Sequence, residues 1–252
     1  MDPARFEGQT AIISGGADGI GKSIARRLSR EGARVVLFDV DETMLAKTRS
    51  EFANDNLAVG TMVVDVSSER QLQQAVESVS REHGHLDIAV HCAGVVGPNG
   101  VRITDVDVAD FDRVYQINLR GSFLIVKHSI AAMQKQRYGR ILLFASIAGK
   151  EGNAGMCCYS ATKSGVIGLV KAVGKEFAES GITVNAIAPA VIRTALVESM
   201  DPVQVKYMTD KIPMKRCGTL DEVTALSCWI VSKEAGFNTA FTFDLSGGRA
   251  VY

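Results

Sequence analysis

The stretch "SGGADGIG" at residues 14–21 decides how the rest of the chain is interpreted. It follows the apolar run "TAIIS" (10–14) and opens a helical pattern over 19–31. Gly15, Gly19 and Gly21 permit a tight turn and a close approach of the backbone to a phosphate, and the helix N-terminus offers free N–H groups. The spacing is G-x-x-x-G-x-G, and glycines needed only for packing are the alternative. Its place between a strand and a helix favours a dinucleotide site.

Outward from this turn, short apolar runs alternate with helical patterns. The runs predict strands at 10–14, 34–38, 57–64, 86–91, 140–146, 182–188 and 240–245, and helices lie between them at 19–31, 68–83, 108–136, 159–179 and 219–232. Most strands are continuously apolar, as in a parallel sheet buried on both faces. We therefore expect one doubly wound α/β domain (a Rossmann fold) over 1–252, with about seven strands and helices on both faces. A Pro-containing excursion at about 190–218 is expected to bind substrate.

Composition narrows the possible partners and the compartment. Lys+Arg and Asp+Glu are balanced at 28 each, which gives no electrostatic reason to expect a nucleic acid or an anionic membrane as partner. The first ten residues are too polar for a signal peptide, and no stretch reaches the ~18 apolar residues of a membrane span. The five cysteines form no C-x-x-C pattern, and none lies at ligand spacing from the four histidines. We expect reduced thiols, no metal and a cytoplasmic location.

Asp39 ends the second predicted strand, 18 residues beyond Gly21. A carboxylate near this offset accepts hydrogen bonds from the adenosine ribose and repels a 2′-phosphate, which favours NAD over NADP. The alternative is an exposed acid that begins the next helix beside Asp41 and Glu42. Lys22 works against the NAD preference if it attracts a 2′-phosphate.

Further motifs in the same order resemble the short-chain dehydrogenase/reductase family along nearly the whole chain. They are "DV" (Asp65, Val66), "HCAG" (91–94), Asn118 in "QINLRG", Ser146, the Y-x-x-x-K of Tyr159 and Lys163, and "NAIAPAVIRT" (185–194). The sequence departs from the family pattern at Ser14, at His91 and at Ala190. The resemblance implies an NAD-dependent oxidoreductase acting on CH–OH groups, and a homotetramer. Together with the glycine turn and Asp39, it gives these cofactor contacts: Gly15, Asp18, Gly19, Ile20, Gly21, Asp39, Asp65, Val66, Cys92, Ala93, Gly94, Tyr159, Lys163, Pro189, Ile192 and Thr194.

The expected chemistry is proton transfer by Tyr159. A free tyrosine, with a pKa of ~10, is a poor base, and a cation one helical turn away favours the phenolate. We therefore expect Lys163 to lower the pKa of Tyr159, which acts as general acid/base, while Ser146 orients the substrate oxygen. By resemblance, Lys163 also binds the nicotinamide ribose, and Asn118 helps to hold a water in a proton relay to Lys163. Taken singly, these residues have ordinary alternatives: Ser146 as a turn cap and the others as polar helix residues.

The substrate is predicted from polar residues near these groups. Candidates are Ser146, Lys150, Asn153, Cys157 and Met214, with Arg193 and Arg216 as further cations; a solvated turn at Lys150 and Glu151 is the alternative. The polarity of "GKEGNAGM" (149–156) and its resemblance to relatives that act on sugar acids favour a 2-keto-3-deoxy sugar acid, of the 4-dehydrogenase type, or a polyol. The alternatives are a 3-oxoacyl thioester reductase and, in another class, a non-catalytic nucleotide-binding scaffold or sensor. The tail "FDLSGGRAVY", ending at Tyr252, is expected near a neighbouring subunit's cleft.

Overall fold

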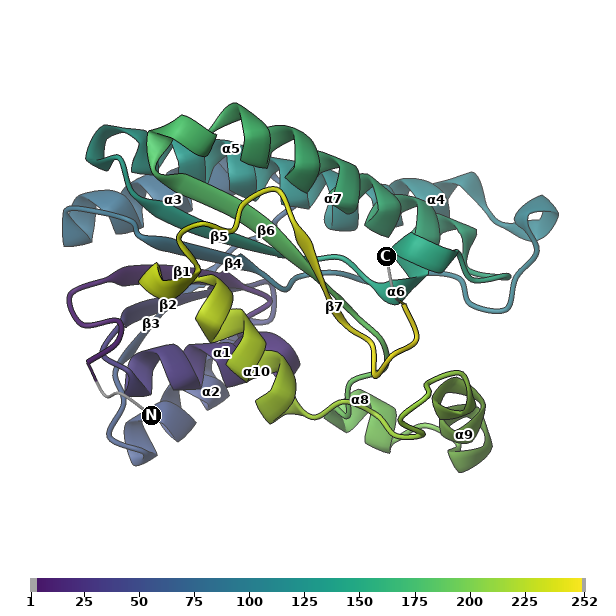
Figure 1. Cartoon of the computed structure of the whole chain (residues 1–252). Coiled ribbons are helices and arrows are strands. Elements are labelled where there is room, and N and C mark those ends of the chain that lie inside the picture. The colour runs from purple at the N-terminus through teal and green to yellow at the C-terminus, as the bar shows by residue number, and fades with distance from the viewer. Residues whose placement is uncertain (1–3, 251–252) are drawn as a thin grey trace.

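A computed structural model describes residues 4–250 of the chain. Seven parallel strands form one sheet in the order β3-β2-β1-β4-β5-β6-β7 (Figure 1). Each predicted strand is present, and its ends lie within two residues of the predicted ones. The strands are β1 (Thr10–Ser14), β2 (Arg34–Asp39), β3 (Val59–Val63), β4 (Ile88–His91), β5 (Gly139–Phe144), β6 (Ile182–Pro189) and β7 (Thr242–Leu245). The doubly wound class predicted from the sequence is confirmed.

Helices cover both faces of the sheet (Figure 1). One layer contains α1 (Gly19–Arg30), α2 (Glu42–Asn54) and α10 (Leu220–Ile230). The opposite layer contains α3 (Glu69–His83), α4 (Val108–Tyr115), α5 (Gly121–Met133) and α7 (Cys157–Glu176). The short helices α6 (Ile147–Glu151), α8 (Ala195–Glu198) and α9 (Pro202–Asp210) follow the carboxyl ends of β5 and β6, where an open α/β sheet binds its ligands. Single 3₁₀ turns lie at Ile103–Asp105, Gln134–Gln136, Ala178–Ser180 and Lys233–Ala235.

The helix predicted over 108–136 is interrupted. A π-helical turn at Gln116–Arg120 separates α4 from α5, and a 3₁₀ turn ends the segment. Such turns re-aim side chains and occur often at functional sites. The residue in the middle of this one is Asn118, which is fully buried. Hydrophobic periodicity cannot show this local change of winding.

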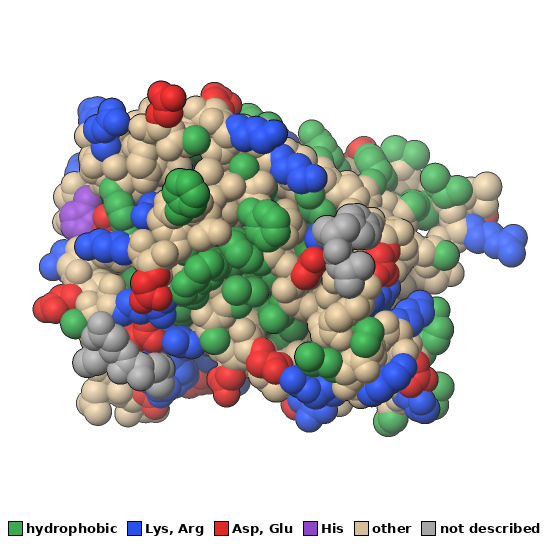
Figure 2. Space-filling model, in the orientation of Figure 1, with side chains coloured by type: hydrophobic (Ala, Val, Ile, Leu, Met, Phe, Trp, Pro, Cys, Tyr) green, Lys and Arg blue, Asp and Glu red, His purple; other side chains and the backbone are tan. Residues whose placement is uncertain are grey.

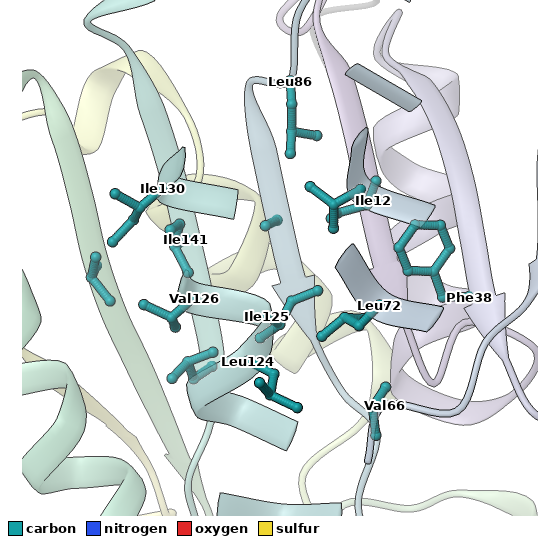
Figure 3. Packing of buried hydrophobic residues seen from close by; sticks show 14 of the residues in the cluster. Ile12, Phe38, Val66, Leu72, Leu86, Leu124, Ile125, Val126, Ile130 and Ile141 are labelled. Atoms are coloured by element: carbon teal, nitrogen blue, oxygen red, sulfur yellow. The ribbon is translucent and has the colours of Figure 1, made fainter. Parts of the chain in front are cut away.

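The sheet is packed between two apolar layers, because its central strands carry large hydrophobic residues on both faces. Figure 3 shows the layer that joins the sheet to α3 and α5, to which Ile12, Phe38, Leu72, Ile125 and Ile141 belong. The edge strand β3 is an exception, with partly covered residues and Val63 54% exposed. No helix among residues 4–250 combines the length and the apolar character needed to cross a membrane.

Candidate active site

The glycine turn is built for contact with neighbouring backbone and with a ligand. Gly15 has φ 63°, and a Cβ there would lie 2.7 Å from the Ala93 nitrogen, so the turn packs directly on the loop after β4. A Cβ on Gly21 would collide with the Gly15 carbonyl oxygen. Gly19 differs, because it has φ 55° and a Cβ would project into open space. Gly15 and Gly21 therefore serve packing, and Gly19 leaves room for another molecule.

The start of α1 is open to an anion. Its N-cap residue, Asp18, makes no side-chain capping bond, and the first turn contains no acid. By contrast, Asp41, Ser68 and Thr219 cap α2, α3 and α10 with side-chain oxygens. Uncapped N–H groups at the positive end of the helix dipole suit a phosphate.

Asp39 lies at the end of β2 and faces this turn. One carboxylate oxygen accepts a hydrogen bond from the Ala17 N–H (3.1 Å), and the other accepts one from the Val40 N–H (2.8 Å). It borders a cavity of about 330 Å³ at the carboxyl edge of the sheet. The other predicted residues around that cavity are Gly15, Asp18, Asp65, Val66, Cys92, Ala93 and Gly94. Val40, Val64, Val95 and Ile117 also line it; we did not predict them, although Val40 and Val64 directly follow strand ends.

Lys22 does not line this cavity. Its ammonium pairs with Glu51 on α2, and that hydrogen bond holds the pKa of the Glu51 carboxyl below its ordinary value. The Lys22 side chain is 18% exposed. A cation already neutralised by a carboxylate attracts a 2′-phosphate weakly, so Lys22 does not oppose the NAD preference that Asp39 favours.

A second cavity, of about 240 Å³, adjoins the first and shares Cys92, Gly94 and Val95 with it. Ser146, Tyr159 and Lys163 line its wall. The predicted cofactor residues around it are Ile20, Cys92, Gly94, Tyr159, Lys163, Pro189, Ile192 and Thr194, and Val96, Phe144, Ala145 and Ala190 were missed. Every predicted cofactor residue except Gly19 and Gly21 therefore lines one of the two cavities.

Ser146, Tyr159 and Lys163 meet although they come from different elements. Ser146 is the N-cap of α6, where its Oγ accepts a hydrogen bond from the Ala148 N–H (3.1 Å), and it also hydrogen-bonds the Tyr159 phenol. The alternative role of Ser146 as a cap is thus real, and it coexists with the contact to Tyr159. Lys163 donates from Nζ to the Phe144 carbonyl (2.6 Å) and lies 5.6 Å from the centre of the Tyr159 ring.

Burial dominates the proton affinities of this group. It raises the pKa of the Tyr159 phenol, and the hydrogen bond from Ser146 offsets part of that rise. Burial lowers the pKa of Lys163 to about 8, against a smaller opposing contribution from Cys92. The net shift at Tyr159 is opposite to the lowering by Lys163 that we expected. The spacing of the two residues does not show that the phenol is buried or that the Lys163 ammonium is directed to a backbone carbonyl.

Asn118 fixes the loop between the two cavities. Its Oδ1 accepts from the Val95 N–H (2.8 Å), and its Nδ2 donates to the Val95 carbonyl (2.8 Å) and to Thr162 Oγ1 (3.3 Å). The side chain lines neither cavity. It therefore ties the loop after Gly94 to α7, the helix that carries Tyr159 and Lys163.

His91 replaces the asparagine usual in the resembled family and keeps a link between two central strands. Its Nδ1 lies 2.6 Å from Ser14 Oγ, across the β1–β4 pairing. Its Nε2 is buried and has no hydrogen-bond partner among the described residues. Burial lowers the pKa of His91 to about 3, so the imidazole is neutral at physiological pH.

The predicted substrate residues do not lie together in one cavity. Only Ser146 lines the cavity that contains Tyr159. Lys150 is neither a free cation nor part of a solvated turn, because its side chain is 8% exposed and its Nζ lies 2.8 Å from Asp244 Oδ1. Cys157 lies beside Cys158, with 3.9 Å between the sulfur atoms. Met214 is exposed and lines a separate cavity of about 330 Å³. Ala190 lines both this cavity and the one that contains Tyr159.

The cations Arg216 and Arg249 also have hydrogen-bonding partners within the chain. Arg216 makes a bidentate pair with Glu222 (2.8 and 2.6 Å), which holds the pKa of Glu222 at about 2. Arg249 bonds Glu151 and Asn153 within the same chain. The tail residues Val251 and Tyr252 lie outside the described residues. Within residues 4–250, no group of three or more His, Cys, Asp or Glu side chains is arranged to hold a metal ion.

Comparison with known proteins extends the similarity over the whole chain. A family model described as enoyl-(acyl carrier protein) reductase matches residues 15–249. A 2-dehydro-3-deoxy-L-rhamnonate dehydrogenase (NAD(+)) from Sphingomonas sp. (strain SKA58) is 40% identical over 248 residues, which cover 98% of each chain. A 3-oxoacyl-[acyl-carrier-protein] reductase from Thermotoga maritima is 32% identical over 247 residues, 98% of this chain and 100% of the relative.

Solved structures agree with these relatives. A putative gluconate dehydrogenase from Agrobacterium tumefaciens superposes with a TM-score of 0.93 at 25% identity, covering 100% of both chains. An NAD+-bound xylitol dehydrogenase superposes with a TM-score of 0.90 at 28% identity, covering 97% of this chain and 100% of the other. The motifs, the fold and the family match agree: the chain belongs to the short-chain dehydrogenase/reductase family of oxidoreductases.

Proposed function

We propose that this oxidoreductase interconverts a secondary alcohol and a ketone on a sugar acid, or on a related polyol, with NAD as its cofactor. One observation carries the proposal: of two adjoining cavities, one is lined by Asp39 and the other by the Ser146, Tyr159 and Lys163 group. This arrangement matches an extended dinucleotide whose reactive ring reaches a proton donor. We take residues 1–252 as one NAD-binding domain with a substrate-binding excursion at about 190–218.

The chain offers contacts for each part of NAD. The Asp39 carboxylate accepts hydrogen bonds from the adenosine ribose, and Asp65 and Val66 lie next to the adenine. The open N-terminus of α1 receives the pyrophosphate, and Gly19 leaves space for it. Lys163 holds the second ribose, while Pro189, Ile192 and Thr194 border the nicotinamide. When bound, NAD supplies the hydride acceptor or donor.

Tyr159 moves the proton of the reacting hydroxyl. Its raised pKa keeps the phenol protonated at neutral pH, which suits proton donation to a ketone. In the oxidative direction the phenolate must be stabilised, and the hydrogen bond from Ser146 contributes to this. Lys163, with a pKa of about 8, is mostly charged at pH 7 and adds positive potential on the same side. Ser146 orients the substrate oxygen, and Asn118 holds the adjoining loop, with a relay water as its expected partner.

A sugar acid is supported by the dehydrogenase relative from Sphingomonas, whose printed activity is on such a compound. The similarity to 3-oxoacyl reductases supports a second candidate, the reduction of a 3-oxoacyl thioester. The position of Asp39 and the pairing of Lys22 with Glu51 favour NAD, and with it the first candidate.

Steady-state rates distinguish the two candidates. The substrates are sugar acids, polyols and 3-oxoacyl thioesters, each paired with NAD(H) and with NADP(H). Rapid NADH formation from a sugar acid or polyol supports the proposal. A clear preference for thioester reduction with NADPH overturns it.

We also propose a homotetramer in the cytoplasm. Phe237 and Phe241 are exposed beside β7, the open edge of the sheet, where hydrophobic side chains gather on the surface (Figure 2). A second exposed apolar group lies on and before α4, formed by Ile103, Val108 and Phe111. Exposed apolar patches of this kind mark contact surfaces. All five cysteines are free thiols, in keeping with a reducing compartment. Light scattering of the purified protein measures the assembly, and a monomer at micromolar concentration would contradict it.

A further inference from the structure

The segment that follows Ser146 is tied to the end of the chain. Lys150 Nζ lies 2.8 Å from Asp244 Oδ1 on β7. Arg249 donates from Nε (2.9 Å) and Nη2 (2.7 Å) to Glu151 Oε2. We call the residues that make these contacts the tail clamp: Lys150, Glu151, Asn153, Asp244 and Arg249. In Figure 1, the yellow chain after β7 runs beside α6, where these contacts form.

The tail clamp is more than a pair of surface contacts. Exposed ion pairs fix little, because water and salt compete with them. Here the Lys150 and Arg249 side chains are only 8% and 10% exposed. Arg249 also donates to Asn153 Oδ1 (3.3 Å), so its guanidinium holds both sides of the α6 C-terminus. Their carboxylate partners, Asp244 and Glu151, are 27% and 30% exposed, so each pair encloses its cation, which would be poorly hydrated if it left the carboxylate.

The tethered helix has little stability of its own. α6 contains five residues, and helices of this length are not stable without tertiary contacts. Gly152 (φ 69°) and Gly155 (φ 78°) follow it in backbone conformations that favour glycine. The connection from Ser146 to Tyr159 therefore lacks a rigid element, and contacts from outside must hold α6 in place.

Other contacts also anchor α6, because its first two residues, Ile147 and Ala148, are buried. A Cβ on Gly149 would lie 2.7 Å from the Lys163 carbonyl carbon, so α6 sits directly on α7. Ser164 Oγ donates to the Gly149 carbonyl (2.6 Å) at the same point. This contact holds the middle of α6 against α7, and the tail clamp holds its C-terminal end. Because Ser146 is the N-cap of α6, any rotation moves its hydroxyl relative to Tyr159.

We propose that the tail clamp is a positioning device: the C-terminal segment fixes α6 and thereby holds the Ser146 hydroxyl in register with Tyr159. The proposal rests on the proposed function, since it concerns the same reaction. None of the five clamp residues lines the cavity that contains Tyr159, so they act through α6 and not on substrate.

The test uses three variants. Two are the single variants Arg249→Ala and Glu151→Gln, and the third exchanges the two charges by combining Glu151→Arg and Arg249→Glu in one chain. The single variants should lower kcat by about 10- to 100-fold, because displacements near 1 Å cost that much. The dissociation constant for NAD, from fluorescence titration, should stay within about twofold, since the clamp contacts neither cofactor cavity. The charge exchange should recover most of kcat. Arg27→Ala is the matched control: it breaks the 2.7 Å pair with the buried Glu31 on α1 and should lower only the melting temperature.

Hydrogen exchange supplies a readout that needs no activity. The Ala148 N–H donates to Ser146 Oγ, so loosening of α6 should speed exchange over 147–152 in Arg249→Ala and Glu151→Gln but not in Arg27→Ala. If wild-type protein oxidises no alcohol, the proposed function fails, while this exchange still tests the clamp. Unchanged exchange in both single variants, or kcat equal to wild type below the melting temperature, overturns the clamp. Loss of NAD binding in step with kcat also overturns it, because that result means general unfolding.

Discussion

Replacement of Asp39 by Asn should shift the cofactor preference away from NAD. The exchange removes the negative charge and keeps an oxygen that can accept from the Ala17 or the Val40 N–H, so the glycine turn retains a tether to β2. Asp39→Ala would lose these two bonds and a third, from the Asp41 N–H (3.3 Å), and would disturb the turn for either cofactor. Asparagine therefore isolates the effect of the charge.

The size of the shift follows from two contributions. A hydrogen bond to a charged acceptor is roughly twice as strong as one to a neutral acceptor, so NAD loses about 1.4 kcal/mol. A carboxylate and a 2′-phosphate about 4 Å apart repel each other by about 1 to 4 kcal/mol, depending on solvent exposure, and NADP is relieved of this repulsion. Together these give about 3 kcal/mol, or roughly a 100-fold fall in the ratio of kcat/KM for NAD to that for NADP.

The assay is the initial rate with each cofactor at saturating alcohol. Glu51→Gln is combined with Asp39→Asn in a second variant, because it frees Lys22 from its ion pair. The double variant should use NADP better than Asp39→Asn alone. A ratio that stays at the wild-type value in Asp39→Asn would refute the assignment of this carboxylate to the ribose.

The remaining predictions concern catalysis, stability and packing. Tyr159→Phe should lower the oxidation rate by about 10²- to 10⁴-fold, with NAD affinity by titration unchanged. Lys163 has a pKa of about 8 when folded and 10.5 ordinarily, so wild-type stability should rise as pH increases between these values. Lys163→Met removes this buried cation and should be inactive. Its free energy of unfolding in urea at pH 7 should nevertheless be about 2 kcal/mol higher than that of the wild type, even with the loss of the bond to the Phe144 carbonyl counted. His91 has a pKa of about 3 in the folded protein and 6.5 ordinarily, so the protein takes up a proton when it unfolds below pH 6.5. Lowering the pH to 5 should therefore reduce the free energy of unfolding by about 2 kcal/mol. Melting curves of His91→Asn should not show this reduction. Gly149→Ala should push α6 off α7 and lower stability by about 1 to 3 kcal/mol together with kcat; a fully active, equally stable variant would contradict the packing described.

The sequence predicted what depends on local pattern. Continuous apolar runs predicted the strands, and residues at strand ends predicted the cavity lining, because parallel strands bring their carboxyl ends to one edge. It could not predict contacts between distant segments. Lys150 was expected to contact substrate or to lie in a solvated turn, because its partner, Asp244, is on a strand formed near the end of the chain.

Two other differences have the same origin. The spacing of Tyr159 and Lys163 predicted a lowered phenol pKa, but burial, which depends on the whole fold, raises it. The bond between Ser14 and His91 joins two central strands far apart in sequence, so no local pattern indicates Ser14 as the partner. Local chemistry was thus readable from the sequence, while desolvation and long-range pairing required the structure.

The most direct test of the account is NADH formation by the purified protein from NAD and a 2-keto-3-deoxy sugar acid, with Tyr159→Phe measured in parallel. We expect steady NADH formation by the wild type, a slower rate with NADP, and a rate at least about 100-fold lower in the variant. No NADH from any sugar acid or polyol, or equal rates for the wild type and Tyr159→Phe, would contradict it.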